Sequence, residues 1–387
     1  MIKKFIKGAL GLLGILVLCF VLLPTGQVSA ADGDPYYWAG NSGNWSDVAH
    51  WSSTDDGTGG DYATPPNATN DVFFSTNAFT LAGQTVTVDA TATCKDMDWT
   101  GATNSPTLAT TNQILYYYGN ATFIAAMSIT KTGISYINCA GTGTLTTNGL
   151  SINSTYVGNA GTGTLTYGDA LTTTGTILHN SGTINTAGQT VTALIYQKST
   201  ATAATLTLGN STVNVAAWTY SGSNLTLTAN TSTINCSGNF SGGGLTTYNI
   251  VNLTGATSTI TGSNTFNTLG LTRAGVQTIT FTDGTTQTLT TLIRDASTAV
   301  KTLQGSGAAG WAITSQGNVQ SVDYISISRS TASPLGRFFA GNHSTDGGNN
   351  VGWYFTTPEA EPGASLASFG LGIKRLSIIT GSLIKRV

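Results

Sequence analysis

The sequence predicts an all-β protein, a right-handed parallel β-helix (β-solenoid) with about 20–22 residues per coil and aromatic-rich caps at both ends. Three observations lead to this prediction. Gly contributes 48 of the 387 residues and charged residues only 8%, a composition that gives helices little polar surface. Strand-forming residues alternate with Thr, Ser and Asn, and Gly or Asn interrupt the runs. Similar alternating segments also recur at a nearly constant distance.

The repeats define the expected coil. AGTGTLT occurs at Ala140–Thr146 and again at Ala160–Thr166, and TLTLGNSTVNV, which ends at Val215, is echoed by NLTLTANTSTINC, which ends at Cys236. Such a unit is too short for a helical hairpin. It suits a coil whose strands pair in parallel with those above and below, about 4.8 Å away. Equivalent inward residues should then stack on each other. The predicted stacked pairs are Val213 with Ile234, Val215 with Cys236, and Leu145 with Leu165.

Residues 1–30 have the features of a secretory signal. Lys3, Lys4 and Lys7 precede a long apolar run, and the segment ends at the small residue Ala30. We therefore expect export and a secreted or cell-surface location in a bacterium. A retained membrane anchor is the alternative, because the apolar run is at the short end of the lengths that span a bilayer.

The repeats predict a solenoid body over residues 79–330, with an aperiodic, aromatic-rich segment on each side. Residues 31–78, rich in Trp and Asp, are predicted to form the N-terminal cap, and residues 331–357 the C-terminal cap. A solenoid needs such caps because the strand edges at its two ends would otherwise be unpaired. Residues 358–387 are predicted to be a linker and a basic, apolar tail.

The tail combines an acidic start with apolar and basic residues. Glu361 and Pro362 precede an apolar stretch that reaches Lys374 and Arg375. This order loosely resembles the Pro-Glu-Pro type of bacterial sorting tail, and the resemblance implies sorting or attachment at the cell surface. An amphipathic segment that lies on a membrane surface is the alternative. A membrane contact is therefore expected only through the tail or an uncleaved N-terminus.

Acidic and basic residues are segregated along the chain. Residues 31–94 contain eight aspartates and no Lys or Arg, whereas the four charged residues after Pro362 are all basic. The body has no basic surface with interleaved aromatic residues. Nucleic acid is therefore not an expected partner.

Three cysteines follow the signal, at Cys94, Cys139 and Cys236. Their odd number and the absence of C-x-x-C spacing argue against a disulfide framework and a zinc site. We expect buried, unreactive thiols.

The N-terminal cap holds the residues most typical of ligand binding. Asp55, Asp56 and Asp61 surround a Gly-rich turn, and carboxylate oxygens on a flexible loop are what Ca²⁺ requires, although the EF-hand pattern is absent. No other cofactor is expected. Aromatic residues nearby fit either a sugar-binding platform or the small core of the cap. These aromatic residues are Trp38, Trp45, Trp51 and Tyr62.

An enzymatic function is one alternative, because parallel β-helices include polysaccharide lyases and glycoside hydrolases. The charged groups that such an enzyme would use are Asp283, Arg294, Asp295 and Lys301. Arg273 precedes Arg294, and Lys301 precedes Asp323, by about one coil, so a ladder of ion pairs on one surface explains the same residues. We therefore expect no enzymatic activity.

Several segments resemble secreted or phage-borne β-helical surface proteins. They are GNSGNWSDVAHW, NDVFF, AGQTVTVD and CKDMDWTGATNSP, followed by coils rich in Gly, Thr and Asn. The chain is similar, more loosely, to autotransporter passengers and filamentous-haemagglutinin-type adhesins. The resemblance implies a surface rod and carries no activity with it.

The expected function is structural or adhesin-like. An exported cell-surface solenoid would mediate attachment, or build a surface layer or matrix, through many weak contacts that include glycans or neighbouring surface material. A carbohydrate-active enzyme, either a lyase or a hydrolase, is the alternative. A phage-related receptor-binding rod is the third interpretation, and the secretory signal argues against it.

Overall fold

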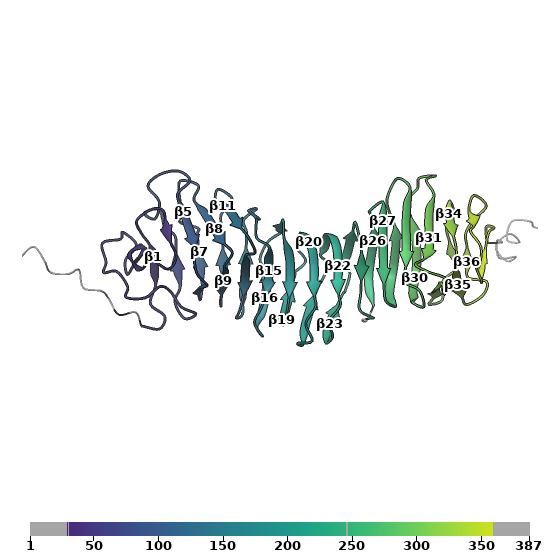
Figure 1. Ribbon diagram of the computed structural model, residues 1–387, viewed down its shortest axis with the longest axis horizontal. Coiled ribbons are helices and arrows are strands. Elements are labelled where there is room, and N and C mark those ends of the chain that lie inside the picture. Colours follow the sequence, from purple (N-terminus) through teal and green to yellow (C-terminus); the bar gives the residue numbers. More distant parts are fainter. Residues whose placement is uncertain (1–28, 30, 245–246, 359–387) are drawn as a thin grey trace, which may run out of the picture.

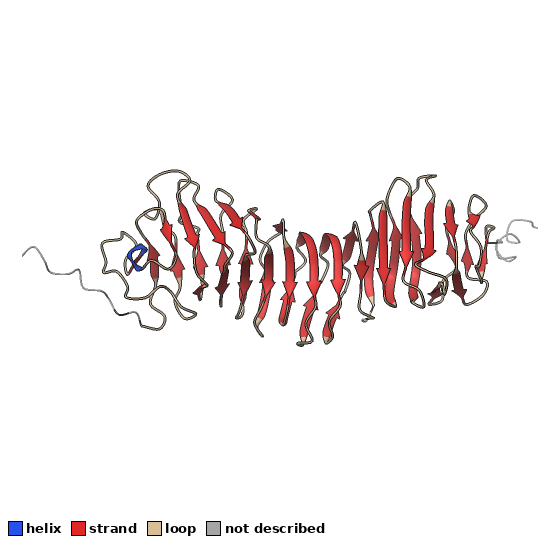
Figure 2. Ribbon diagram, in the orientation of Figure 1, coloured by secondary structure: helices blue, strands red, loops and turns tan. Residues whose placement is uncertain are grey.

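The computed structural model describes residue 29 and residues 31–244 and 247–358. They form an all-β parallel solenoid of about 12 turns with 48% of residues in strands (Figure 1). The chain runs from one end of an elongated, bent rod to the other. One short 3₁₀ helix, η1 (Val48–His50), lies near the N-terminal end (Figure 2). No helix in the described residues has the length and apolar character needed to cross a membrane.

Each early coil contributes one strand to each of three sheets. The first sheet contains β1 (Tyr36–Trp38), β3 (Trp51–Ser52), β4 (Val72–Phe73), β7 (Met97–Asp98), β10 (Ala121–Thr122), β13 (Gly143–Thr146), β16 (Thr164–Tyr167), β19 (Gly182–Asn185), β21 (Ala204–Thr207) and β23 (Leu225–Thr228). The second contains β2 (Gly43–Asn44), β5 (Thr85–Val88), β8 (Thr107–Thr111) and β11 (Ser128–Thr132).

The third set of strands continues to the C-terminal end. Its first members are β6 (Ala92–Cys94), β9 (Ile114–Tyr117), β12 (Tyr136–Cys139), β14 (Ser151–Ile152), β15 (Tyr156–Asn159), β17 (Leu171–Thr173), β18 (Thr176–His179), β20 (Thr190–Lys198), β22 (Thr212–Tyr220), β24 (Thr233–Cys236) and β25 (Phe240–Ser241). The later ones are β26 (Tyr248–Leu253), β27 (Thr257–Thr261), β28 (Asn264–Leu271), β29 (Gln277–Phe281), β30 (Thr286–Arg294), β31 (Lys301–Gly305), β32 (Trp311–Ser315), β34 (Ile325–Ile327), β35 (Ser330–Ser333) and β37 (Thr345–Asp346). A small sheet of β33 (Gln320–Ser321), β36 (Phe338–Phe339) and β38 (Trp353–Tyr354) lies beside them.

The core is a set of side-chain stacks that run along the rod. Val213 pairs with Ile234 and Val215 with Cys236, as the repeats predict. The first stack continues through Val251 to later coils, and its members are almost fully buried. Alternation within each strand places these apolar residues inward and the intervening Thr and Asn residues outward.

The coils are less uniform than the repeats predict. One coil spans 17 residues between the paired Asn235 and Asn252, whereas another spans 24 residues between Thr280 and Gln304. The strands keep their register while the corners between them change length. A solenoid tolerates such changes because corners lie at the surface.

The prediction that Leu145 stacks on Leu165 is wrong. Leu145 lies opposite Tyr167, and Leu165 lies opposite Gly143. The corner before β16 is longer by two residues than the corner before β13, and a two-residue shift leaves every side chain on its original face. Both leucines are therefore still buried.

Close packing between coils explains why the repeated AGTGTLT segment contains glycines. A Cβ atom at Gly143 would collide with the carbonyl of Gly119, and one at Gly161 with the carbonyl of Ala140. Glycine permits this close approach of successive corners. The segment is thus a packing element of the solenoid.

The predicted N-terminal cap takes part in the rod. β1 and β2 pair in parallel with β4 and β5 of the next coil. β3 then pairs antiparallel with β1 at the outer edge of the first sheet. This reversal covers the edge that further parallel strands would otherwise extend. The predicted signal and tail, residues 1–30 and 358–387, lie almost entirely outside the described residues.

Candidate ligand-binding pocket

The four aromatic residues that suggested a sugar platform lie in the core. Trp38, Trp45, Trp51 and Tyr62 are at most 2% exposed. The Trp51 ring contacts those of Trp38 and Trp45 edge-on, with 5.0 Å between centroids in both cases. Nε1 of Trp51 donates a hydrogen bond to the Trp45 carbonyl at 2.8 Å. Their ring faces are therefore occupied by the protein's own core.

A different pair of aromatic residues faces outward at this end of the rod. Tyr37 lies between the buried Tyr36 and Trp38 on β1, so alternation turns it to the surface. It lies opposite Phe73 on β4, which in turn lies opposite Asp98 on β7. The rings of Tyr37 and Phe73 are stacked, with centroids 5.3 Å apart. The first sheet therefore presents an aromatic pair beside a carboxylate.

The Asp-rich loop supplies a second carboxylate. Asp56 organises the loop, because its Oδ1 accepts hydrogen bonds from Oγ1 of Thr54 and from N and Oγ1 of Thr58. These hydrogen bonds lower the pKa of Asp56. The neighbouring Asp55 is exposed and lies at the wall of the aromatic pair.

These residues enclose a surface pocket of about 250 Å³. The aromatic pair forms one wall, Asp55 and Asp98 contribute carboxylates, and Ser75 and Gly101 complete the lining with their neighbours. Of the two carboxylates, Asp98 accepts a hydrogen bond from the Thr100 amide at 2.8 Å. Sequence reasoning missed Tyr37, Phe73 and Asp98. The alternation of residues in Tyr36–Trp38 could have indicated that Tyr37 faces outward.

The three aspartates predicted to bind Ca²⁺ make different contacts in the structure. No group of three or more His, Cys, Asp or Glu side chains suited to a metal ion occurs in the described parts of the chain. The backbone of Asp61 forms an isolated antiparallel β-bridge with that of Ser52, whereas Asp55 lines the pocket and the Asp56 carboxylate accepts hydrogen bonds within its own loop. Ca²⁺ favours six to eight oxygen ligands.

We expect the melting temperature of the full chain to be the same within error in calcium and in excess chelator. The reason is that a ligand stabilises a fold only by binding it, and the described residues gather no three His, Cys, Asp or Glu side chains suited to a metal ion. Differential scanning calorimetry checks this. A calcium-dependent rise that Asp56→Asn abolishes would contradict it.

The residues considered for catalysis fall into two separate places. Asp283 accepts hydrogen bonds from the amides of Gly307 and Ala309, at 2.8 Å each, beyond the end of the β29–β31 ladder. Asp295 is instead ion-paired with Lys301, which lies at the other end of that ladder. The ladder between them has five residue pairs, and its four steps of about 3.3 Å span about 13 Å. Paired carboxylates in glycosidases lie closer, within about 10 Å.

The expected ladder of ion pairs on one surface is absent from the described coils. Arg294 lies opposite Leu271 rather than Arg273, and Lys301 lies opposite Ile325 rather than Asp323. The Lys301 side chain is fully buried, and Nζ lies 2.7 Å from Oδ1 of Asp295. The cause is the uneven coil length, which shifts equal sequence spacings out of register.

The three cysteines are free and buried, as expected. Burial raises the pKa of the Cys139 thiol to about 11 and also raises that of Cys94 and Cys236. A buried protonated thiol is a poor nucleophile.

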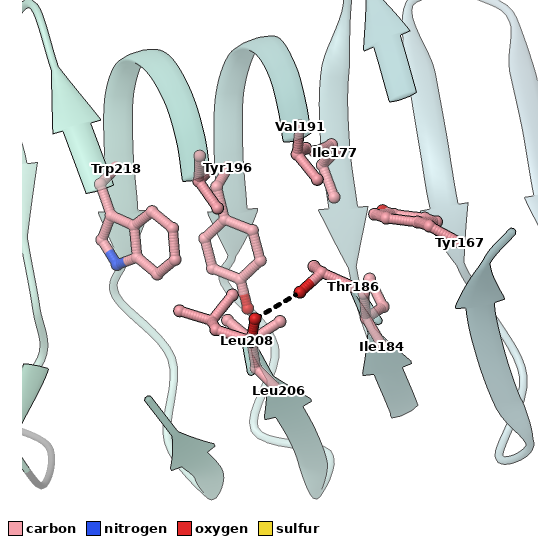
Figure 3. Close-up of a pocket in the computed structure, with 10 residues that line it drawn as sticks. Tyr167, Ile177, Ile184, Thr186, Val191, Tyr196, Leu206, Leu208 and Trp218 are labelled. Carbon is pink, nitrogen blue, oxygen red and sulfur yellow. Dashed lines mark hydrogen bonds between the residues drawn. The ribbon is translucent and has the colours of Figure 1, made fainter. Parts of the chain in front are cut away.

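The interior of the rod leaves little space. A cavity of about 10 Å³ lies between Tyr167 and the stacked rings of Tyr196 and Trp218 (Figure 3). Beside it, Oγ1 of Thr186 donates a hydrogen bond to the Leu208 carbonyl at 3.0 Å. A cavity this small and apolar is a packing defect.

The exposed faces of the middle coils carry no charged side chain. Between residues 170 and 272 the sequence has one Lys and one His, Lys198 and His179, and both are fully buried. Two shallow hollows of about 500 and 490 Å³ lie on these faces, lined mainly by Thr, Asn and Ser. In one of them, Asn214 and Asn235 are linked by an amide hydrogen bond of 2.8 Å. These faces offer hydroxyl and amide groups.

No family model, curated protein or solved structure matches the chain significantly.

Proposed function

We propose that the protein is an exported, cell-surface β-solenoid with a structural or adhesin-like role. In this role the rod attaches to glycans or neighbouring surface material through many weak contacts. The exposed faces of the middle coils carry the proposal, because a surface of hydroxyl and amide groups without charge suits neutral, hydroxyl-rich partners. Such hydrogen bonds are individually weak, since each replaces a bond to water.

The rod shape supports the same role. Equivalent side chains recur along the axis at about 4.8 Å, so one kind of contact is offered many times. Contacts that are weak singly become strong when several form together. A long partner or a surface gains from this repetition, whereas a small soluble sugar does not.

We expect protease shaving of intact cells to release peptides from residues 31–358, because a displayed rod is accessible at the surface. Mass spectrometry of the released peptides checks this. Deleting the residues after Pro362 should move the protein into the medium if the tail anchors it. Full-length protein that stays intact inside shaved cells would contradict the proposal.

A further inference from the structure

We infer that the pocket beside Tyr37 and Phe73 binds a cationic amino sugar, a pyranose that carries a free protonated amine. The inference rests on the proposed role in attachment and names the ligand class of this one site. The pocket of about 250 Å³ is large enough for about one sugar ring and its substituents. It combines two partly exposed aromatic rings with two aspartates.

The aromatic wall selects for a ring with an apolar face. Tyr37 and Phe73 are half-buried, so their rings are fixed by the strands and lose little freedom when a ligand binds. Below them, Phe74 is stacked on Trp99 with centroids 3.6 Å apart, which makes the base of the wall rigid. Aromatic rings attract both C–H groups and cations to their faces.

The charge of the pocket selects for a positive group. Its lining carries two carboxylates, Asp55 and Asp98, and no basic side chain. The nearest basic residue in sequence, Lys95, is paired with Asp71 at 3.1 Å at the opposite end of β4. An acidic sugar would be repelled, and a neutral sugar would leave both charges uncompensated.

The two carboxylates have oxygens that can accept hydrogen bonds from a ligand. Asp55 makes no side-chain hydrogen bond to any described residue, and Oδ2 of Asp98 has no partner in the same set. A protonated amine donates up to three hydrogen bonds, and bonds between charged partners are about twice as strong as neutral ones. Gly101 allows the corner to pack closely against Ser75, because a Cβ there would lie 3.0 Å from the Ser75 Cα.

The test compares two probes that differ by one positive charge per sugar residue, glucosamine hexamer and N-acetylglucosamine hexamer. We expect the full chain to bind the glucosamine hexamer at least tenfold more tightly in isothermal titration calorimetry, and the difference to shrink at high salt. Asp98→Asn and Asp55→Asn should each weaken that binding about tenfold. Asp32→Asn, the same charge change outside the pocket, should alter it less than twofold. Far-UV circular dichroism shows that each variant is folded.

Equal affinity for the two hexamers, tighter binding of the acetylated one, or no binding of either would overturn the inference. Unchanged binding by folded Asp55→Asn protein would also overturn it, because the Asp55 side chain makes no hydrogen bond to any described residue whose loss could obscure the result. The proposed attachment role is tested separately, by protease shaving of intact cells. Its failure and the failure of the amino-sugar site are therefore distinguishable.

Discussion

Replacing Lys301 with Met is expected to lower the free energy of unfolding by about 3 kcal/mol. The ammonium of Lys301 is fully buried and binds Oδ1 of Asp295 at 2.7 Å and the carbonyls of Arg273 and Gly275. Methionine keeps the length of the side chain and removes the charge. Two corner carbonyls then lose their partner, and the Asp295 carboxylate keeps only the weaker ion pair with Arg294, 3.9 Å away. Urea denaturation of the two proteins measures the difference.

The matched control is Lys95→Met, which removes an exposed ion pair. The Lys95 side chain is 49% exposed, and surface pairs contribute about 1 kcal/mol or less. Combining Lys301→Met with Asp295→Asn should recover only part of the loss, because the carboxylate is no longer left without Lys301 but Arg294 loses its ion pair with Asp295. Burial raises the pKa of Asp295, but hydrogen bonds to Lys301 and Ser297 outweigh it, and the pKa falls below its usual value. Equal losses for Lys301→Met and Lys95→Met would contradict this role.

Lowering the pH from 7 to 4 is expected to remove about 3 kcal/mol of stability through His179 alone. Burial lowers the pKa of His179 to about 4; a hydrogen bond to the Gly182 carbonyl opposes this shift, and the nearby Lys198 adds to it. The folded-state pKa is thus below that of the unfolded chain, about 6.5. The stabilisation is complete above pH 6.5 and is lost as the pH falls towards 4. Urea denaturation at several pH values measures it.

The contacts of His179 explain why it stays neutral. Nδ1 lies 3.0 Å from the Tyr196 hydroxyl and Nε2 lies 3.2 Å from the Gly182 carbonyl. A carbonyl only accepts, so Nε2 carries the proton and Nδ1 accepts from Tyr196. His179→Gln retains one donor and one acceptor without titrating, so its stability should fall much less than that of the original protein from pH 6.5 to 4, and aspartates with a lowered pKa such as Asp295 account for the remaining loss. If the unfolding free energy of His179→Gln falls as steeply with pH as that of the original protein, groups other than His179 cause the acid sensitivity.

The alternating sequence pattern by itself predicts much of the fold. Val213 opposite Ile234 followed from two echoed phrases, because side-chain alternation and coil stacking act locally. The pattern failed where corners change length, as between Leu145 and Leu165. Corner length is set by how the chain packs against the coil below, and Gly, Thr and Asn serve corners of several lengths.

The candidate site divides in the same way. The sequence by itself determined a solenoid with uncharged faces and an acidic, aromatic end, because composition and alternation decide which residues face water. Only the tertiary structure decided that Trp38 is buried in the core while Tyr37 lines the pocket. It also placed Asp55 and Asp98, which belong to separate coils, in the lining of the same pocket. It also decided that Lys301 is buried, since a lysine is exposed by default unless partners surround it, here the Asp295 carboxylate and two carbonyls of an earlier coil. Most of these contacts join residues remote in sequence, and no local pattern records them.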